Sequence, residues 1–435
     1  MRLPYPSYKP SGVEWLGDVP EHWEVKRLKF LASINDESLS ETEDPLRPIQ
    51  YVDIGSVDYL AGIIQTKETV FEDAPSRARR LVRHGDTVIS TVGTSLRAVA
   101  HINNPSSEMV VSTGFAVVRP RDMDSNFATW ALREHGFVRE IVARSVGVIY
   151  PAINASEIGN LLIPVPPLEE QRVIAEFLDR ETARVDALVE KKQQLIERLA
   201  EYRTALITQT VTKGLPPDVA AAEEFNPASS FKPSGVEWLG DVPEHWKVKR
   251  LHRICQLAYG DSLPADSRQT GDFPVLGSNG AVGYHKETNT LAPVIVIGRK
   301  GSHGKVNFNN GPIFAIDTTF FIDRRSTDAE LRWLYFSLLC IELDEESMDS
   351  AVPGLSRQYA YEKYLVLPPL QEQRAIAEFL DRETERIDAL SARVESAIER
   401  LQEYRIALIT AAVTGKIDVR GFVGVETADI GTVAK

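Results

Sequence analysis

Two long segments of the amino-acid sequence each occur twice. Residues 9–28 and 232–251 agree at 19 of 20 positions, which is an offset of 223 residues. Residues 166–212 and 368–414 agree at 32 of 47 positions, at an offset of 202 residues. Because repeats of this length decide the architecture before any local motif does, the chain is predicted to be a tandem duplication.

The segments between the repeats differ from each other. Residues 29–165 and 252–367 are 137 and 116 residues long and share almost no identity. Two ordinary duplicated domains that had drifted would carry differences in every loop, whereas here the differences are confined to the middles. We therefore expect constant repeats that present two different binding domains, called here the first reader (29–165) and the second reader (252–367).

The second repeated segment has the spacing of a coiled-coil seam. In its first copy, apolar residues, or polar residues that a coiled-coil seam can tolerate, fall alternately three and four positions apart. They lie at 174, 178, 181, 185, 188, 192, 195, 199, 202 and 206. Pro166 and Pro167 suit the start of a helix, and Gly214 suits its end. Residues 170–207 as one helix would span about 55 Å. Neither helix can bury its seam alone, so the two are expected to pair antiparallel; packing of each helix on its own domain is the alternative.

Both readers are predicted to hold a small β-sheet followed by one amphipathic helix. The first should have strands at 87–92, 97–102 and 109–118 and a helix near 127–144; the second should have strands at 293–297, 305–308 and 313–322 and a helix near 329–341. The expected fold class is α+β: two globular α/β domains separated by two long antiparallel coiled-coil helices, with a pseudo-twofold axis from the duplication.

Residues 298–305 (GRKGSHGK) look like a phosphate-binding loop but do not match one. That motif has four residues between its glycines and a Ser or Thr after the lysine, whereas here five residues intervene and Val306 follows. The loop is interpreted as a glycine-rich turn whose cations suit phosphates and guanine edges. The first reader carries a comparable cluster, Arg77, Arg79, Arg80 and Arg83. A solvated charged face is the ordinary alternative for either cluster alone.

Catalytic constellations are incomplete. Glu24-Val25-Lys26 resembles the end of a nuclease site, but the second copy has Lys247 in place of the glutamate, and no upstream carboxylate is evident. There is no adenosylmethionine-binding loop, and the eight histidines show no metal spacing. Cys255 and Cys340 are expected to be buried reduced thiols. We expect a chain that neither cuts nor methylates DNA unaided, without catalytic or metal-binding residues.

Composition restricts the location and the kind of partner. With 43% hydrophobic and 26% charged residues, this is the composition of an ordinary soluble protein. No apolar stretch approaches the ~18–20 residues that cross a bilayer, and no secretory signal is evident, so a cytoplasmic location without membrane contact is expected. The net charge of −13 argues against nonspecific coating of nucleic acid, but not against DNA contacts through local patches.

The chain resembles the DNA-specificity subunit of type I restriction-modification enzymes. The resemblance covers residues 9–416 and rests on W-L-G-x-V-P-x-H-W, on the paired helices that open with P-P-L-x-E-Q, and on the phrases at 277–280, 298–302 and 353–357. It implies that each reader is a target recognition domain for one half of a split DNA sequence. It also implies that the helices fix the unread spacer and dock methyltransferase subunits. Because the readers differ, the target should be asymmetric.

The resemblance also implies partners and a division of the chain. The partners would be double-stranded DNA, methyltransferase (modification) subunits, expected to be two, and translocating endonuclease (restriction) subunits. Adenosylmethionine would bind to the methyltransferase subunits, and ATP with magnesium would bind to the restriction subunits. This chain should therefore hold no cofactor. The expected parts are the first target recognition domain (1–165), a conserved helix (166–212), a linker (213–230), the second target recognition domain (231–367), a second conserved helix (368–414) and a tail (415–435).

Candidate DNA contacts are chosen from loop position and chemistry, because the readers diverge too far for contacts to be transferred. In the first reader they are Arg77, Arg79, Thr94, Ser95, Arg97 and Tyr150. In the second they are Ser278, Asn279, Arg299, Lys300, Ser302, Lys305, Ser356 and Arg357. Two rivals remain: a coiled-coil scaffold that reads no DNA, and a self-sufficient nuclease or methyltransferase, which the absent motifs disfavour.

Overall fold

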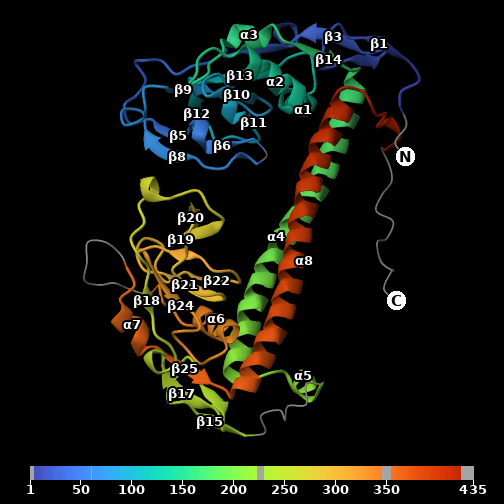
Figure 1. Ribbon diagram of the computed structural model, residues 1–435. Helices are drawn as coiled ribbons and strands as arrows, with labels where there is room; N and C mark the ends of the chain where they lie inside the picture. Colours follow the sequence, from blue (N-terminus) through green and yellow to red (C-terminus); the bar gives the residue numbers. More distant parts are fainter. Residues whose placement is uncertain (1–3, 60, 223–229, 345–353, 423–435) are drawn as a thin grey trace. The chain divides into compact units, whose positions relative to one another are not determined.

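The chain is divided between two compact units. The computed structural model describes residues 4–59, 61–222, 230–344 and 354–422. One unit comprises residues 1–191 and 397–435, and the other comprises residues 192–396. The two long helices, α4 (Leu168–Lys213) and α8 (Leu370–Val413), pass from one unit into the other, so that each unit contains one half of each helix (Figure 1).

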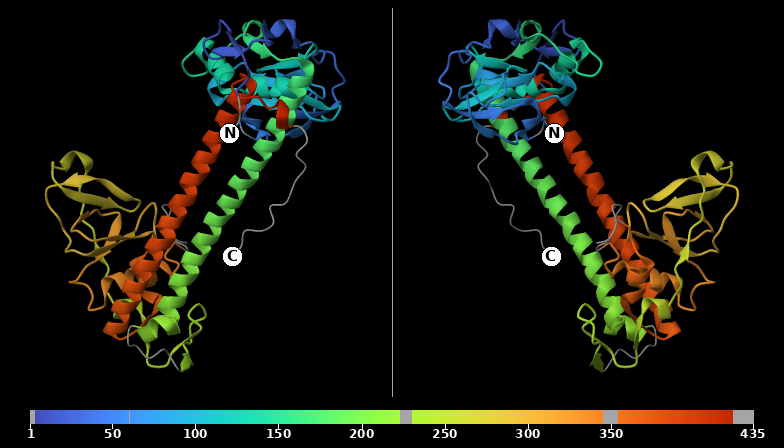
Figure 2. Two further views of the ribbon diagram at one scale, coloured as in Figure 1. Left: turned by 90° about the vertical axis from the view of Figure 1, so that its right-hand side faces the viewer. Right: turned by 90° about the vertical axis from the view of Figure 1, so that its left-hand side faces the viewer.

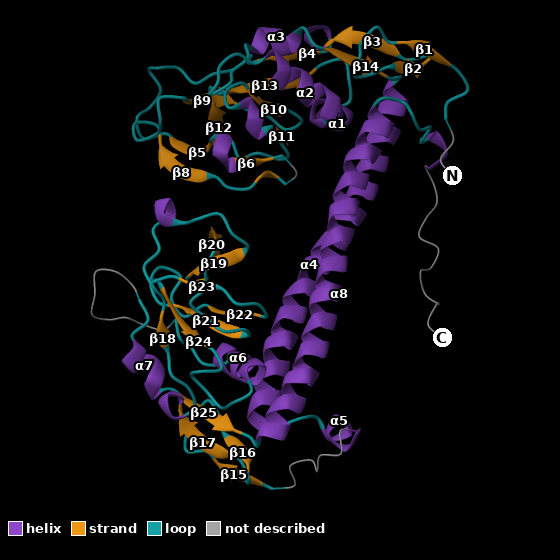
Figure 3. Ribbon diagram, in the orientation of Figure 1, coloured by secondary structure: helices purple, strands orange, loops and turns teal. Residues whose placement is uncertain are grey.

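The first reader contains two four-stranded sheets (Figure 3). One sheet has the order β11-β10-β13-β4 and the other β8-β5-β12-β9, in which β12 runs parallel to β5. The strands of the described chain in this reader are β4 Ala32–Ile34, β5 Pro48–Val52, β6 Val57–Asp58, β7 Gly62–Ile63, β8 Lys67–Val70, β9 Ala78–Leu81, β10 Thr87–Ser90, β11 Val99–His101, β12 Met109–Ser112, β13 Phe115–Pro120 and β14 Leu162–Val165.

The second reader repeats the strand order of the first, except that its second sheet lacks a counterpart of β9. Its four-stranded sheet is β22-β21-β24-β18, and a three-stranded sheet, β20-β19-β23, repeats the parallel pair as β19 with β23. β21 and β24 therefore correspond to β10 and β13. The strands are β18 Ala258–Tyr259, β19 Phe273–Gly277, β20 Gly280–His285, β21 Val294–Gly298, β22 Val306–Asn309, β23 Phe314–Ala315, β24 Thr319–Ile322 and β25 Tyr364–Leu367.

Two predictions about the readers were wrong in the same way. The single strands expected at 109–118 and 313–322 are each two strands in different sheets, because a turn interrupts each apolar run. In the first reader this turn is Thr113-Gly114, whose Gly114 carbonyl accepts from Thr91 N at 2.7 Å. The helix expected at 127–144 is also two, α1 (Ser125–Arg133) and α2 (His135–Arg144), because Glu134 is extended and its carboxylate accepts from Phe137 N.

The remaining helices are short. They are α3 Ala155–Gly159, α5 Pro217–Ala222, α6 Leu331–Leu339 and α7 Arg357–Glu362. α6 corresponds to the helix predicted near 329–341, and it packs on β21 and β22 in the core of its unit.

The first repeated segment joins the start of each reader to its end. It forms a two-stranded hairpin and then a strand that pairs antiparallel with the last strand of the reader, β3 with β14 and β17 with β25. The bounds are β1 Tyr8–Pro10, β2 Asp18–Pro20, β3 Glu24–Arg27, β15 Phe231–Pro233, β16 Asp241–Pro243 and β17 Lys247–Arg250. Each copy contains two tryptophans, and the second of them, Trp23 or Trp246, is fully buried.

The antiparallel pairing of the long helices is confirmed (Figure 2). In the first unit Asp186 lies opposite Arg405, with 2.9 Å from Oδ1 to Nε, and in the second unit Asp388 lies opposite Arg203 at 3.0 Å. α4 ends at Lys213, and the Gly214 that follows has a φ of +95°, which suits glycine.

The seam was predicted correctly only in part. As expected, positions 174, 178, 181, 185, 192, 199 and 206 are buried or half-buried. Positions 188, 195 and 202 are exposed instead, and positions 182, 189, 196 and 203 are buried or half-buried in their place. Thr182 fits the seam because its hydroxyl donates back to Leu178 O at 2.6 Å and leaves its methyl group for packing. Three large apolar side chains of α4 are thus left on the flank of the helix pair.

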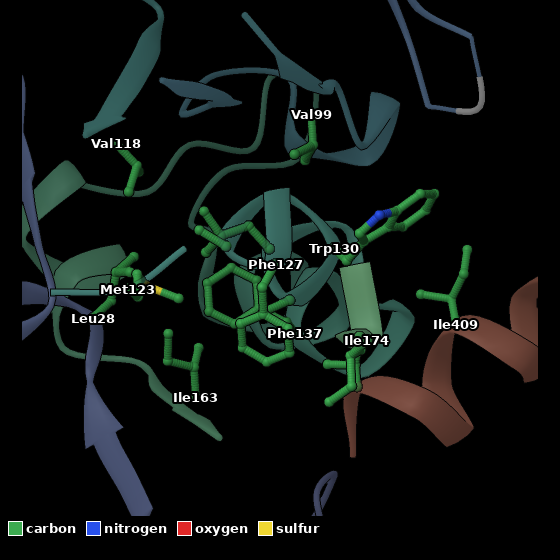
Figure 4. Packing of buried hydrophobic residues seen from close by; sticks show 14 of the residues in the cluster. Leu28, Val99, Val118, Met123, Phe127, Trp130, Phe137, Ile163, Ile174 and Ile409 are labelled. Atoms are coloured by element: carbon green, nitrogen blue, oxygen red, sulfur yellow. The ribbon is translucent and has the colours of Figure 1, made fainter. Parts of the chain in front are cut away.

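The core of the first unit joins the reader to both long helices. Figure 4 shows Phe127, Trp130 and Phe137 of α1 and α2 in one cluster with Ile174 of α4 and Ile409 of α8. The second unit has a corresponding core that includes Trp333 of α6 and residues of both helices. Burial of these aromatic and aliphatic side chains fixes each reader on the helix halves of its own unit.

A buried glutamate joins the first repeated segment to α4. Glu170, in the first turn of α4, accepts hydrogen bonds from Tyr5 Oη at 2.5 Å and Trp23 Nε1 at 3.0 Å, and His22 Nε2 lies 2.8 Å away. Burial and then the neighbouring carboxylate raise the pKa of Tyr5 above its usual range. In the second unit Glu372 accepts a hydrogen bond from Trp246 Nε1 and lies next to His245 Nε2, both at 2.8 Å.

Replacing Glu170 by alanine is expected to lower the free energy of unfolding by about 3–5 kcal/mol, because two buried donors lose a charged acceptor. Urea unfolding of the chain measures the loss. The matched control is Glu372→Ala, which should cost less because that carboxylate is four times more exposed, at 24% against 6%. Equal losses for the two variants would contradict this account.

Candidate nucleic-acid interface

A glycine-rich turn follows β21 in the second reader. Gly304 N donates to Gly298 O at 2.9 Å and Gly298 N donates to Lys305 O at 2.8 Å, which closes the turn. Gly301 has a φ of +73°, and a Cβ on Gly298 would lie 2.1 Å from Ser302 O, so both positions require glycine. The tight turn places the side chains of Arg299, Lys300, Ser302 and Lys305 at the end of the sheet.

Two arginines share one aromatic ring beside this turn. The guanidinium carbons of Arg299 and Arg357 each lie 4.9 Å from the centre of the Tyr259 ring. Backbone hydrogen bonds hold the Arg299 residue there: Leu355 N donates to Arg299 O at 2.8 Å, and Arg299 N donates to Thr318 O at 2.8 Å. Both cations thus lie within cation–π distance of the same ring.

All eight candidate residues of the second reader gather at this place. Lys305 Nζ donates to Asn279 Oδ1 at 3.2 Å, Lys300 forms a β-bridge with Gly354, and Ser356 precedes α7. Ser278 borders the turn from β19, where its Cβ lies 3.2 Å from the position a Cβ would take on Gly298. This cluster, the second-reader cluster, therefore comes from three segments distant in sequence. Whether each residue touches DNA stays a prediction.

Sequence reasoning missed Tyr259. Its ring is partly exposed and forms the surface on which both arginines lie. The only local signal was an aromatic residue immediately before Gly260, and nothing nearby in the sequence linked it to a cation.

The corresponding turn of the first reader follows β10. Thr94, Ser95 and Arg97 lie on and after a single 3₁₀ turn, Thr94–Leu96, and Tyr150 lies in a neighbouring hairpin whose Pro151 carbonyl accepts from Thr94 N at 3.3 Å. Ser95 and Tyr150 are exposed and Arg97 is half-buried. The Thr94 side chain is buried, with its hydroxyl 2.7 Å from Ser145 Oγ, so its observed contact is within the protein.

The other two candidates of the first reader lie on the second sheet. Arg77 is exposed just before β9, and its carbonyl accepts from Thr113 N at 2.7 Å, which places it next to the turn that contacts Thr91. Arg79 packs over the Phe71 ring at 4.5 Å and donates to Ala78 O. Of this pair, Arg77 is the more accessible to a ligand.

Neither cysteine is suited to nucleophilic chemistry. Cys255 is buried, and burial raises the pKa of its thiol to about 12. Cys340 is half-buried, and burial raises its pKa to about 11 despite a hydroxyl hydrogen bond from Thr208. Both are free thiols; burial is as predicted for Cys255 and only partial for Cys340.

Among residues 4–59, 61–222, 230–344 and 354–422, no three acidic, histidine or cysteine side chains are grouped as metal ligands. Within the same described residues, no helix combines the length and apolarity needed to span a bilayer.

The chain belongs to the type I restriction modification DNA specificity domain family. The family model matches twice, at residues 20–198 and 243–400, which include one reader each. The chain is thus a member of the group that provides DNA sequence specificity in type I restriction-modification.

Two relatives can be aligned in sequence with most of the chain. It is 22% identical to a putative specificity subunit of the type I restriction enzyme MjaX of Methanocaldococcus jannaschii, covering 93% of this chain and 96% of that protein. It is 21% identical to the specificity subunit of the type I restriction enzyme EcoDI of Escherichia coli, covering 69% and 72%.

Solved structures share the fold. One match is a chain from a structure that concerns complex assembly and conformational transition of the type I R-M system. Its TM-score is 0.70 and its identity 24%, and the match covers 92% of this chain and 99% of that one. The HsdS subunit from Thermoanaerobacter tengcongensis matches with a TM-score of 0.52 and 24% identity, covering 92% and 98%.

Proposed function

We propose that the chain selects the DNA target of a type I restriction-modification complex by reading two different half-sites. The observation that carries the proposal is that two readers of one topology present different chemistry at corresponding strand ends. The second reader offers Arg299 and Arg357 on Tyr259, which suits bidentate contacts to guanine in the major groove. The first offers Ser95 and Arg97 beside an uncharged hairpin. Unlike readers give an asymmetric, split target.

In this proposal the chain is a non-catalytic subunit without a cofactor. Two modification subunits would bind adenosylmethionine and transfer methyl groups to adenine, and restriction subunits would bind ATP and magnesium. The net charge of −13 supports this division of roles among the subunits. A chain with excess negative charge needs partners that supply much of the positive charge that binds the DNA phosphates.

The long helices would dock the modification subunits and set the spacer. Support comes from large apolar side chains left exposed on the flank of the helix pair: Leu188, Leu195 and Tyr202 on α4, and Leu390 and Tyr404 on α8. We call these five residues the flank stripe. Leu188 and Tyr202 correspond to Leu390 and Tyr404 in the repeat, offset by 202 residues, so the duplication provides two similar docking surfaces.

Modified-base sequencing tests the proposal. Cells that express the chain with its modification subunit should gain N6-methyladenine at one split, asymmetric motif, and cells without the chain should lack it. Exchange of residues 29–165 for the reader of another family member should change one half of the motif and leave the other half unchanged. An unchanged motif after the exchange would contradict the proposal and favour a scaffold that reads no DNA.

A further inference from the structure

The first reader carries a hairpin with a firmly held base. Val146 and Ala152 exchange two backbone hydrogen bonds, of 2.9 and 3.0 Å, and Ala152 also bridges Val92. Ser145, where the hairpin begins, contacts Thr94 Oγ1 at 2.7 Å and donates to Ile141 O of α2 at 2.8 Å. The base is thus fixed both to the turn after β10 and to α2.

The tip of this hairpin is apolar and exposed. Val148 is 99% exposed, Ile149 83% and Tyr150 75%. Val146, at the base, and Leu96, on the adjoining turn, are exposed as well. A contiguous apolar surface of this kind, held on a fixed base, is typical of a site that is covered by a partner.

The chemistry of the hairpin favours base surfaces over phosphates. Residues 145–153 (SVGVIYPAI) contain no charged side chain, so the tip has no cation for a phosphate oxygen. The adjoining turn supplies the polar groups, with Ser95 exposed and Arg97 half-buried. It also occupies the place that the turn of the second-reader cluster occupies after β21. Apolar side chains that enter a base step unstack it and bend the duplex.

We infer that Val148, Ile149 and Tyr150 form a wedge that enters one base step of the first half-site and unstacks it. The inference rests on the proposed DNA-reading function and adds a mechanical role to it. Methylation of a base requires the base to leave the stack, and a step that is already opened makes this departure easier. Ser95 and Arg97 would hold the neighbouring backbone while the wedge is inserted.

The wedge is tested in the complex of the full chain with its modification subunit. Target duplexes carry 2-aminopurine at successive positions of the first half-site, and binding should raise its fluorescence several-fold at one step. Val148→Ser with Ile149→Ser should abolish this rise and weaken binding by roughly 10–100-fold, while the salt dependence stays unchanged because no phosphate contact is lost. The control is Leu46→Ser, an exposed leucine of the same reader outside the hairpin, which should change neither quantity.

A second measurement separates a wedge from an ordinary contact. An abasic site at the opened step removes the stacking that the wedge must break, so it should restore binding by the double variant to within a few-fold of the wild type. Circular dichroism and copurification with the modification subunit verify folding and assembly.

Three results would overturn the wedge. The first is an unchanged fluorescence rise in the double variant, with specific binding intact. The second is a failure of the abasic site to restore binding. The third is a folded double variant that no longer assembles with the modification subunit, which would make the patch a protein contact. Absence of specific binding by the wild-type complex would instead overturn the proposed function, and the wedge with it.

Discussion

Arg299→Ala or Arg357→Ala is expected to lower binding to the second half-site by about 5–150-fold and to relax base choice there, while the first half-site is read as before. The range corresponds to the ~1–3 kcal/mol of one bidentate contact between an arginine and a guanine. Because both guanidinium groups lie on the Tyr259 ring, the effects of the two substitutions should not add. Competition binding with duplexes that vary one half-site at a time measures this.

Two further variants serve as controls for this prediction. Lys300→Ala should weaken binding to all sequences alike and reduce the salt slope by about 1, as expected for a phosphate contact. Tyr259→Phe keeps the ring and should be nearly neutral, whereas Tyr259→Leu should resemble the arginine variants. A methylation motif that keeps every base of the second half-site after Arg299→Ala and Arg357→Ala would remove this cluster from the interface.

Placing acidic residues on the flank stripe is expected to abolish methylation. The changes are made in one chain: Leu188→Glu and Tyr404→Glu in the first unit, and Tyr202→Glu and Leu390→Glu in the second. Burying one such side chain contributes about 1.5–3 kcal/mol, so loss of two contacts should weaken docking more than ~100-fold. Mass photometry of the copurified complex should show the modification subunits lost, and modified-base sequencing should show no motif.

The repeat supplies a matched control for the flank stripe. Ala187 and Ala389 occupy corresponding exposed positions on α4 and α8, next to Leu188 and Leu390 in sequence but on a different face of each helix. Ala187→Glu with Ala389→Glu adds the same kind of charge without touching the stripe, and the complex should remain intact. Full methylation by the stripe variant would show that the modification subunits dock elsewhere.

The sequence was sufficient to predict the duplication, the long helices and their antiparallel pairing, because these features depend on patterns that extend over dozens of residues. Part of the seam was missed for a physical reason. Leu188, Leu195 and Tyr202 are more apolar than Thr182 or Arg203, so these three positions were expected to be buried. The structure leaves them exposed, whereas Thr182 is buried and Arg203 is half-buried.

Local features of the readers were less predictable. The apolar run at 109–118 hides a turn at Thr113-Gly114 that sends the chain into a second sheet. Arg299 and Arg357 could be selected for their charge and loop position. Their common partner Tyr259 could not, because contacts between segments forty or more residues apart leave no local pattern. Thr94 was chosen as a polar loop residue, but only the fold reveals that its hydroxyl is held by Ser145.

The pairing of β3 with β14 has a consequence for how such a chain can change. In each unit the strand before the reader is hydrogen-bonded to the last strand of the reader, with Arg27 opposite Leu162 and Arg250 opposite Tyr364. The variable polypeptide therefore leaves and rejoins the constant part at nearly one point, as an inserted domain with adjacent termini does. A substitute of different length need only close the same short gap, and the 21-residue difference between 137 and 116 residues is accommodated without altering the helices.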